Sequence, residues 1–263
     1  MDGGILTFHY IWIIKETFMK KAVPNIITSL SLLTGSVSII MVFQGNLYWS
    51  GWFIIFAAVF DFFDGFAART LNAISPIGKF LDSLSDLVSF GVAPAMVYYF
   101  IIQNVLNTSY ITTLNENASF MMYFAYVPVL LILASAFRLA RFTVNSSNNE
   151  CFEGVPTTAV GIFSAAIAFL ATGTPGMFWA FILTNIYLIT LMVVILSVLE
   201  VVKLPMINLK FKNYSLKENA ERYILIIASL PLLLFFKWEA IPLIMAIYVL
   251  LSLISLIKMK KIC

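Results

Sequence analysis

Long apolar runs limit what this sequence can fold into. Runs of about 20 predominantly apolar residues recur along the chain, and each can cross a hydrocarbon core about 30 Å thick as a helix. Charged residues make up 11% of the 263 residues, whereas a typical soluble domain carries about 25%. Because backbone polar groups in lipid must be paired internally, the sequence predicts an all-α, polytopic membrane protein.

We predict about eight transmembrane helices, which follow the apolar runs 25–44, 48–70, 78–104, 119–142, 158–173, 177–200, 221–236 and 239–257. Residues 5–19 are apolar but too short to span a membrane, and they contain Lys15 and Glu16 beside Trp12. That composition is typical of a helix that lies on the membrane surface. The predicted bundle is therefore preceded by an N-terminal interfacial helix.

The basic residues indicate how the chain is oriented. If the N-terminus is cytoplasmic, Lys237 is the only Lys or Arg that falls on the outer side, as the positive-inside rule requires. The outer connections 105–118 and 173–176 carry no charge other than Glu116. We therefore predict a multi-pass plasma-membrane protein with both termini in the cytoplasm.

Four of the five aspartates lie within one short stretch, DFFDGFAARTLNAISPIGKFLDSLSD. Asp61 and Asp64 are three residues apart at the end of one predicted span, and Asp82 and Asp86 are four apart at the start of the next. Each pair shares a helical face, and a proline and a glycine between the pairs favour a turn. The two pairs are thus expected to meet near the cytoplasmic edge of the membrane.

Four neighbouring carboxylates repel one another and are costly at a membrane boundary. The stretch itself offers only two cations, Arg69 and Lys79, so salt bridges alone do not balance the charge. Carboxylate oxygens are the ligands that Mg²⁺ prefers, and pairs of metals held by such acids recur in phosphoryl chemistry. The sequence therefore predicts a divalent metal site at the cytoplasmic edge, rather than a purely structural cluster.

The spacing of these acids with their neighbours resembles the signature of the CDP-alcohol phosphatidyltransferases. The matching pattern is Asp61-x-x-Asp64-Gly65-x-x-Ala68-Arg69-x8-Gly78-x3-Asp82-x3-Asp86. The resemblance implies that the four aspartates bind two divalent metals, Mg²⁺ or Mn²⁺, which hold the pyrophosphate of a CDP-linked lipid. It also implies that Asp86 is the base that activates an acceptor alcohol, that CMP leaves, and that the protein forms a homodimer.

The same resemblance divides the chain into three parts. It implies an N-terminal interfacial segment at 1–21, a core of six transmembrane helices at 22–200, and a C-terminal loop with two further transmembrane helices at 201–263. Those last two helices are plain apolar segments, which either support the core or extend a dimer interface.

Small and basic residues around the acids are candidates for binding the CDP-lipid. Gly65 and Ala68 leave room for a ligand beside the second helix, although small residues also favour close helix packing in membranes. Arg69 either holds a phosphate through its forked donors or anchors the cytoplasmic side. The resemblance and the turn composition add Ile26, Ile27, Thr28, Ser29, Ser75 and Gly78 as CDP-lipid-binding candidates.

Three further stretches bear on the acceptor. FRLARFTV, FEGVPTTA and SFGVAPA resemble motifs of the phosphatidylserine synthases of this family, with departures at Thr143 and Val155. They imply transfer to L-serine, giving phosphatidylserine. Arg138 and Arg141 are three apart and share a helical face, and a guanidinium suits the serine carboxylate. The two arginines also fit lipid phosphate contacts or positive-inside anchors, and Glu153 fits either the serine ammonium or a solvated loop.

Two other readings remain open from the sequence. One keeps the family and changes the acceptor to glycerol phosphate, inositol or inositol phosphate. The other is a cation transporter, which predicts further acids near the bilayer midplane. The lipid is either CDP-diacylglycerol or its ether-linked counterpart CDP-archaeol, and we expect membrane lipids but no nucleic acid among the partners.

Overall fold

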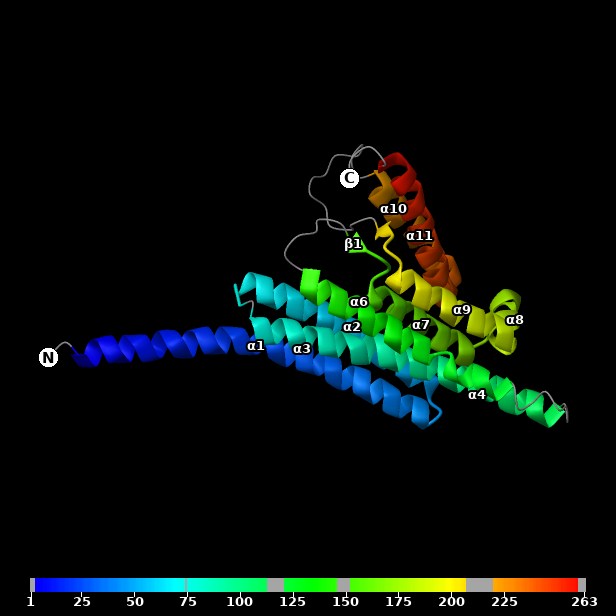
Figure 1. Cartoon of the computed structure of the whole chain (residues 1–263), viewed down its shortest axis with the longest axis horizontal. Coiled ribbons are helices and arrows are strands. Elements are labelled where there is room, and N and C mark those ends of the chain that lie inside the picture. The colour runs from blue at the N-terminus through cyan, green and yellow to red at the C-terminus, as the bar shows by residue number, and fades with distance from the viewer. Residues whose placement is uncertain (1–2, 74, 113–120, 146–151, 207–219, 260–263) are drawn as a thin grey trace.

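The computed structural model describes residues 3–73, 75–112, 121–145, 152–206 and 220–259. Most of its helices pack side by side into one bundle, and the last two stand at a steep angle to it (Figure 1). The predicted all-α, polytopic membrane class is confirmed. In chain order the elements are α1 (Gly3–Phe43), α2 (Leu47–Thr70), α3 (Pro76–Asp86), the π-helix η1 (Leu87–Val92), α4 (Ala93–Thr112), the 3-10 helix η2 (Met122–Tyr126), α6 (Val129–Asn145), β1 (Phe152–Glu153), α7 (Thr157–Thr172), α8 (Met177–Thr184), α9 (Ile186–Val201), β2 (Pro205–Met206), α10 (Ala220–Phe236), the 3-10 turn η3 (Lys237–Glu239) and α11 (Ala240–Met259).

The number of spans differs from the prediction of about eight. Within the described ranges, five helical stretches are long and apolar enough to cross a membrane, or six if α7 and α8, bent by 97°, form one span. The predicted span 177–200 is interrupted at Asn185, because this side chain accepts from Tyr187 N (3.0 Å) and Leu188 N (3.3 Å) and so caps the start of α9. The last two predicted spans lie in one apolar helical stretch, Arg222–Ile254, because only the turn η3 separates α10 from α11. Within this stretch α10 and α11 pack against each other (Figure 1).

The first helix is longer than predicted. Residues 5–19 are helical, but no turn separates them from the first span, and the first part of α1 extends beyond the bundle (Figure 1). Pro24 lies inside α1, whereas the predicted first span begins only after it, at residue 25. A proline removes one helical hydrogen bond, and membrane helices tolerate that loss without breaking.

Hydroxyl groups fasten α1 to its neighbours in the part of the bundle that carries the acids. Ser31 Oγ donates to Ala57 O of α2 at 3.0 Å. Ser85 Oγ of α3 donates to Thr28 O at 3.3 Å, and Ser89 Oγ of η1 donates to Ser31 O at 3.1 Å. In lipid, where the helices gain little from the hydrophobic effect, such bonds and close packing hold the helices together. They fix the acid-bearing ends of α2 and α3 beside α1.

Two short strands pair beside the ends of α6 and α9. β1, in the loop after α6, pairs antiparallel with β2, which follows α9. Gly154 N then donates to Leu204 O at 2.8 Å. Gly154 has φ +75°, and a Cβ there would lie 2.6 Å from the carbonyl oxygen of Glu200. The glycine of the FEGVP stretch thus allows this loop to lie against the end of α9.

Candidate active site

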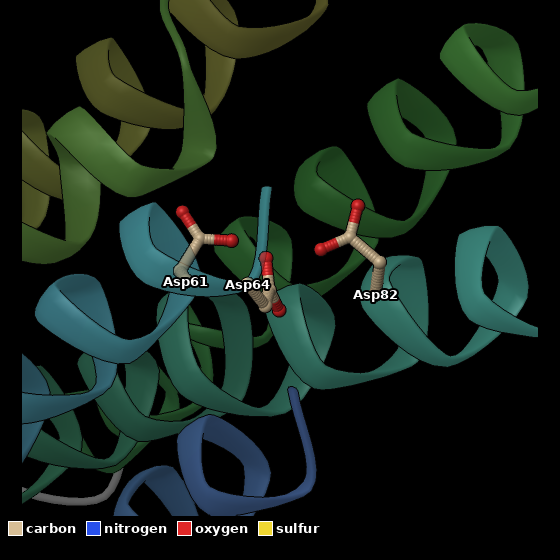
Figure 2. A group of neighbouring side chains, drawn as sticks. All are labelled: Asp61, Asp64 and Asp82. Atoms are coloured by element: carbon tan, nitrogen blue, oxygen red, sulfur yellow. The ribbon is translucent and has the colours of Figure 1, made fainter. Parts of the chain in front are cut away.

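The two aspartate pairs meet, as the spacing predicts. Asp61 and Asp64 project from the last turns of α2, and Asp82 projects from α3. One carboxylate oxygen of each residue lies within 4.8 Å of the others, and Figure 2 shows the three carboxyl groups converging with that of Asp64 in the middle. Asp64 is only 5% exposed. Helices α2 and α3 therefore build one acidic centre from residues that are separated by a turn.

The fourth aspartate adjoins this group through Asp61. The carboxyl groups of Asp61 and Asp86 are in hydrogen-bonding contact, and two ionised carboxylates in contact require a cation or a shared proton between them. Asp86 is the last residue of α3, immediately before the π-helix η1. Such local widening of a helix is frequent at functional sites.

These acids fit a divalent metal ion. Asp64 Oδ2 and Asp86 Oδ1 are buried without a hydrogen-bond partner, so both have free lone pairs in a place where an unpaired charge is costly. Opposite oxygen ligands of Mg²⁺ are separated by roughly 4.2 Å, so oxygens that all lie within 4.8 Å of one another match the size of such an ion. Asp61, Asp64, Asp82 and Asp86 are the available ligands.

A cleft of about 250 Å³ opens beside the acids, between α1, α2 and the start of α3. Its lining includes most of the predicted CDP-lipid contacts, and it also includes residues that the sequence did not single out as ligands. The predicted residues in the lining are Thr28, Gly65, Ala68, Arg69, Ser75 and Gly78, and the additional ones are Pro24, Asn25, Ala73 and Lys79, beside Asp64 and Asp82. Asn25 is the one side-chain amide in the lining. Its position directly after Pro24 is the sequence feature from which it could have been predicted.

Three predicted contacts of α1 are not in this lining. Ile26 is 59% exposed, and Ser29 Oγ donates to Asn25 O at 2.8 Å within its own helix. Ile27 is half-buried and also lies outside the lining. Of the segment 26–29, only Thr28 reaches both the cleft and the Asp64 carboxyl group.

The turn between the acid pairs is built by a capped helix start. Ser75 Oγ accepts from Gly78 N at 3.0 Å, and Pro76 occupies the first helical position of α3, a common combination at helix N-termini. A Cβ on Gly78 would lie 2.9 Å from Asn25 Oδ1. A Cβ on Gly65 would meet only Arg69 Nη2, at 3.9 Å. Gly78 thus permits close packing of α3 on α1, whereas Gly65 keeps the cleft open.

The two arginines of α6 have different partners. Arg141 Nη1 donates to the Val201 carbonyl oxygen at the end of α9, at 3.1 Å. Arg138 Nη1 donates to Thr157 Oγ1 at 3.2 Å, while its Nε is buried without a partner. Arg138 also interacts electrostatically with Asp86. Arg138 therefore adjoins the acidic centre, and Arg141 binds the backbone of a neighbouring helix.

Glu200 is a buried acid that sequence reasoning missed. It lies in the last turn of α9 and is 2% exposed. Its Oε2 accepts from Ser135 Oγ at 2.8 Å, and its Oε1 is buried without a partner. The signal was present, because an ionisable residue at the end of an apolar membrane helix is a functional candidate. The sequence instead makes Glu153 a candidate partner of the serine ammonium group. The side chain of Glu153 is not among the described side chains.

A helical membrane bundle in which carboxylates able to hold a metal ion lie beside a cleft with acidic and basic residues in its lining is typical of one class: metal-dependent enzymes that act on phosphorylated substrates. Residues 21–199 match the family model of the CDP-alcohol phosphatidyltransferases, and the chain belongs to that family. The family assignment is at odds with the cation-transporter reading.

Several relatives resemble this chain over much of its length. A CDP-diacylglycerol–serine O-phosphatidyltransferase of Helicobacter pylori is 28% identical over 241 residues, which cover 88% of this chain and 89% of that protein. A protein of the same name from Bacillus subtilis is 31% identical over 165 residues, covering 59% of this chain and 83% of the relative. An archaetidylserine synthase of Methanothermobacter thermautotrophicus is 32% identical over 143 residues, covering 54% and 55%.

Proposed function

We propose that this protein transfers the phosphatidyl group of a CDP-linked lipid to the hydroxyl group of L-serine, giving phosphatidylserine and CMP. The observation that carries the proposal is the convergence of Asp61, Asp64 and Asp82 beside a cleft in which small and basic residues are exposed. The names of the Helicobacter and Bacillus relatives support serine as the acceptor. The name of the archaeal relative, an archaetidylserine synthase, supports CDP-archaeol as the alternative lipid substrate.

The cleft suits the CDP part of the substrate. Arg69 and Lys79 are cations in its lining, and Gly65 leaves the α2 backbone accessible. We propose that two divalent metals, Mg²⁺ or Mn²⁺, bind the four aspartates, and such ions neutralise pyrophosphate charge and orient it when bound. Since these groups would contact the nucleotide and phosphates, the proposed site fits either CDP-diacylglycerol or CDP-archaeol.

Asp86 is the proposed general base. The oxygen of the serine hydroxyl attacks the phosphorus of the phosphatidyl group, and its proton passes to Asp86. The bond between that phosphorus and the bridging oxygen breaks, and CMP leaves with the electron pair. Asp86 Oδ1 is buried without a partner, so it has a free lone pair for this proton. A positioned carboxylate of this kind contributes about 10²- to 10⁴-fold to a rate.

An acceptor panel tests the proposal. Purified protein in detergent is incubated with CDP-diacylglycerol, Mn²⁺ or Mg²⁺, and one labelled acceptor at a time: L-serine, glycerol 3-phosphate, inositol or inositol phosphate. We expect only serine to become lipid-soluble, with CMP released in equal amount. Transfer to another acceptor in place of serine would contradict the serine assignment and keep the family, and CDP-archaeol in a parallel series tests the lipid.

We also propose a location and an assembly. The placement of all basic residues except Lys237 on one side supports a plasma-membrane protein with both termini and the active site in the cytoplasm. Five of these residues lie outside the described ranges: Lys210, Lys212, Lys217, Lys260 and Lys261. The homodimer implied by the family resemblance is tested by the mass of the detergent-solubilised protein. A monomer with full activity would contradict it.

A further inference from the structure

Arg138 and Glu200 are opposite charges on facing sides of α6 and α9, because Ser135, one turn before Arg138 on α6, donates to Glu200. They attract each other electrostatically, yet Arg138 Nε and Glu200 Oε1 are both buried and have no hydrogen-bond partner. Buried charges are normally paired, because an uncompensated one is strongly destabilising. A single polar guest bound between the donor and the acceptor would supply the partner that each of these two buried atoms lacks.

The chemistry of the open atoms specifies that guest. A guanidinium N–H donates to a carboxylate, and a buried carboxylate oxygen accepts from an ammonium. A molecule carrying both groups a short distance apart is an amino acid in its zwitterionic form. Arg138 also interacts with Asp86, so the hydroxyl of a bound amino acid would lie near the proposed base.

The surroundings hold these two side chains in place. Ser135 Oγ donates to Glu200 Oε2 at 2.8 Å, and Arg138 Nη1 donates to Thr157 Oγ1 at 3.2 Å. Tyr248 of α11, outside the residues that match the family model, also interacts with Arg138. Each charged group is thus fixed through one atom while another atom lacks a partner, as expected for a preorganised binding site.

We propose that Glu200 binds the ammonium group of the acceptor while Arg138 binds its carboxylate, so that Glu200 selects an amino acid over the other alcohols used in this family. This inference rests on the proposed transfer to serine. Glycerol phosphate and inositol carry no ammonium group, and each would leave the Glu200 carboxylate buried and unpaired. A site built around a buried polar group rejects analogues that lack its partner.

The test uses two serine analogues and three variants. 3-Hydroxypropionate lacks the ammonium group and ethanolamine lacks the carboxylate, while both keep the hydroxyl. In Glu200→Gln, the amide oxygen retains the bond from Ser135 but the charge is lost. We expect the KM for serine to rise about 10- to 100-fold, as loss of a charged hydrogen bond implies, with CDP-lipid affinity unchanged. The preference for serine over 3-hydroxypropionate should fall by a similar factor, and the preference over ethanolamine should stay.

Glu200→Asp keeps the charge and should retain the preference for serine over 3-hydroxypropionate, even if its KM rises. Ser197→Ala is the matched control, because Ser197 is buried one turn earlier on α9 and donates only to Val193 O. It should behave as the wild type in all these measurements.

Three outcomes would overturn the inference. The first is an unchanged KM for serine and unchanged selectivity in Glu200→Gln. The second is a loss of CDP-lipid binding and thermal stability in both Glu200 variants, which would indicate a structural acid. The third is equal loss of selectivity in Glu200→Gln and Glu200→Asp. A wild-type enzyme that uses another acceptor would instead contradict the proposed function itself, so the two failures are distinguishable.

Discussion

The guanidinium of Arg141 donates to the carbonyl oxygen of Val201 at a distance of 3.1 Å. This bond satisfies one of the terminal carbonyls of α9 and places a positive charge at the negative end of the helix dipole. It also ties α6 to α9 beside Glu200. The neighbouring Arg138, one turn earlier, has a buried Nε without a partner. Two arginines that look equivalent in the FRLARF stretch therefore have different tasks.

The first prediction separates these arginines. Arg141→Ala should lower the stability of the protein in detergent by about 1–3 kcal/mol, the range for a charged hydrogen bond, and leave the KM for serine within about twofold. Arg138→Ala should raise the KM for serine at least tenfold, because its free Nε is the proposed carboxylate ligand. Thermal unfolding and steady-state kinetics measure both. If Arg141→Ala raised the KM for serine and Arg138→Ala lowered only stability, the assignment of the two arginines would be wrong.

The second prediction concerns the metal. Because Asp64 Oδ2 and Asp86 Oδ1 are buried without partners, removing divalent ions with EDTA should abolish transfer, and adding Mg²⁺ or Mn²⁺ in excess should restore it. Binding of Mn²⁺ to the protein, followed by its paramagnetic resonance, should weaken in Asp64→Asn. Full activity in excess chelator would refute a metal requirement.

The third prediction distinguishes a base from a ligand. Asp86→Asn preserves size but removes the basic oxygen, so turnover should fall about 10²- to 10⁴-fold with a smaller effect on CDP-lipid affinity. Asp61→Asn should impair both, because Asp61 belongs to the three-carboxylate group. Turnover, CDP-lipid affinity and metal content are measured for each purified variant. If CDP-lipid affinity falls equally in both, Asp86 is a metal ligand rather than the base.

The fourth prediction compares two glycines of the cleft. Gly65→Ala adds a methyl group that meets only Arg69 Nη2 at 3.9 Å, and alanine favours a helix by roughly 0.5–1 kcal/mol over glycine. The variant should be at least as stable as wild type, yet bind the CDP-lipid more weakly, since the methyl group enters the proposed phosphate site. Unchanged lipid affinity would remove Gly65 from that site.

Gly78→Ala is the matched partner of that experiment. Its methyl group would lie 2.9 Å from Asn25 Oδ1 and 3.0 Å from Ser75 Oγ, so these two side chains must be displaced from the cleft wall and from the cap of α3. We expect both stability and CDP-lipid affinity to fall, as seen by thermal unfolding and equilibrium binding. A stable Gly78→Ala variant with normal affinity would show that this close approach is dispensable.

The fifth prediction concerns orientation. A single cysteine at Asn107 should react with a membrane-impermeant thiol reagent added outside intact cells, and one at Lys203 should react only after the membrane is opened. The measurement uses a background in which Cys151 and Cys263 are replaced by serine. Labelling of Lys203→Cys from outside would invert the orientation that the basic residues indicate.

The periodicity of the acids was sufficient to predict their meeting. Residues three or four apart must share a helical face, so Asp61 with Asp64 and Asp82 with Asp86 form pairs in any helix that contains them. The proline and glycine between the pairs require a turn, and a short turn brings adjacent helices together. The small and basic residues beside the acids were found for the same reason, because they belong to the same two helix ends.

Other features depend on contacts between segments that are distant in sequence. The predicted separation of a surface helix at 5–19 from a first span at 25–44 is not seen in α1, because a local pattern does not reveal what the rest of a helix tolerates. The sequence also did not reveal the bend of 97° between α7 and α8 or the short length of α9. Mean hydropathy does not distinguish a broken span from a straight one. Asn25 became a cleft residue only because Gly78 allows α3 to approach it.

The sequence by itself determined the membrane class, the helical fold and the acidic centre, because each follows from composition or from the spacing of neighbours on one helix. Only the tertiary structure decided which buried charges face one another. Arg138 and Arg141 are equivalent by spacing, and Glu200 is far from both along the chain. The packing of α6 against α9, fixed by the bonds from Ser135 and Arg141, assigns Arg141 to the backbone and sets Arg138 beside Glu200. Such pairing depends on how two helices are rotated against each other, which no local pattern records.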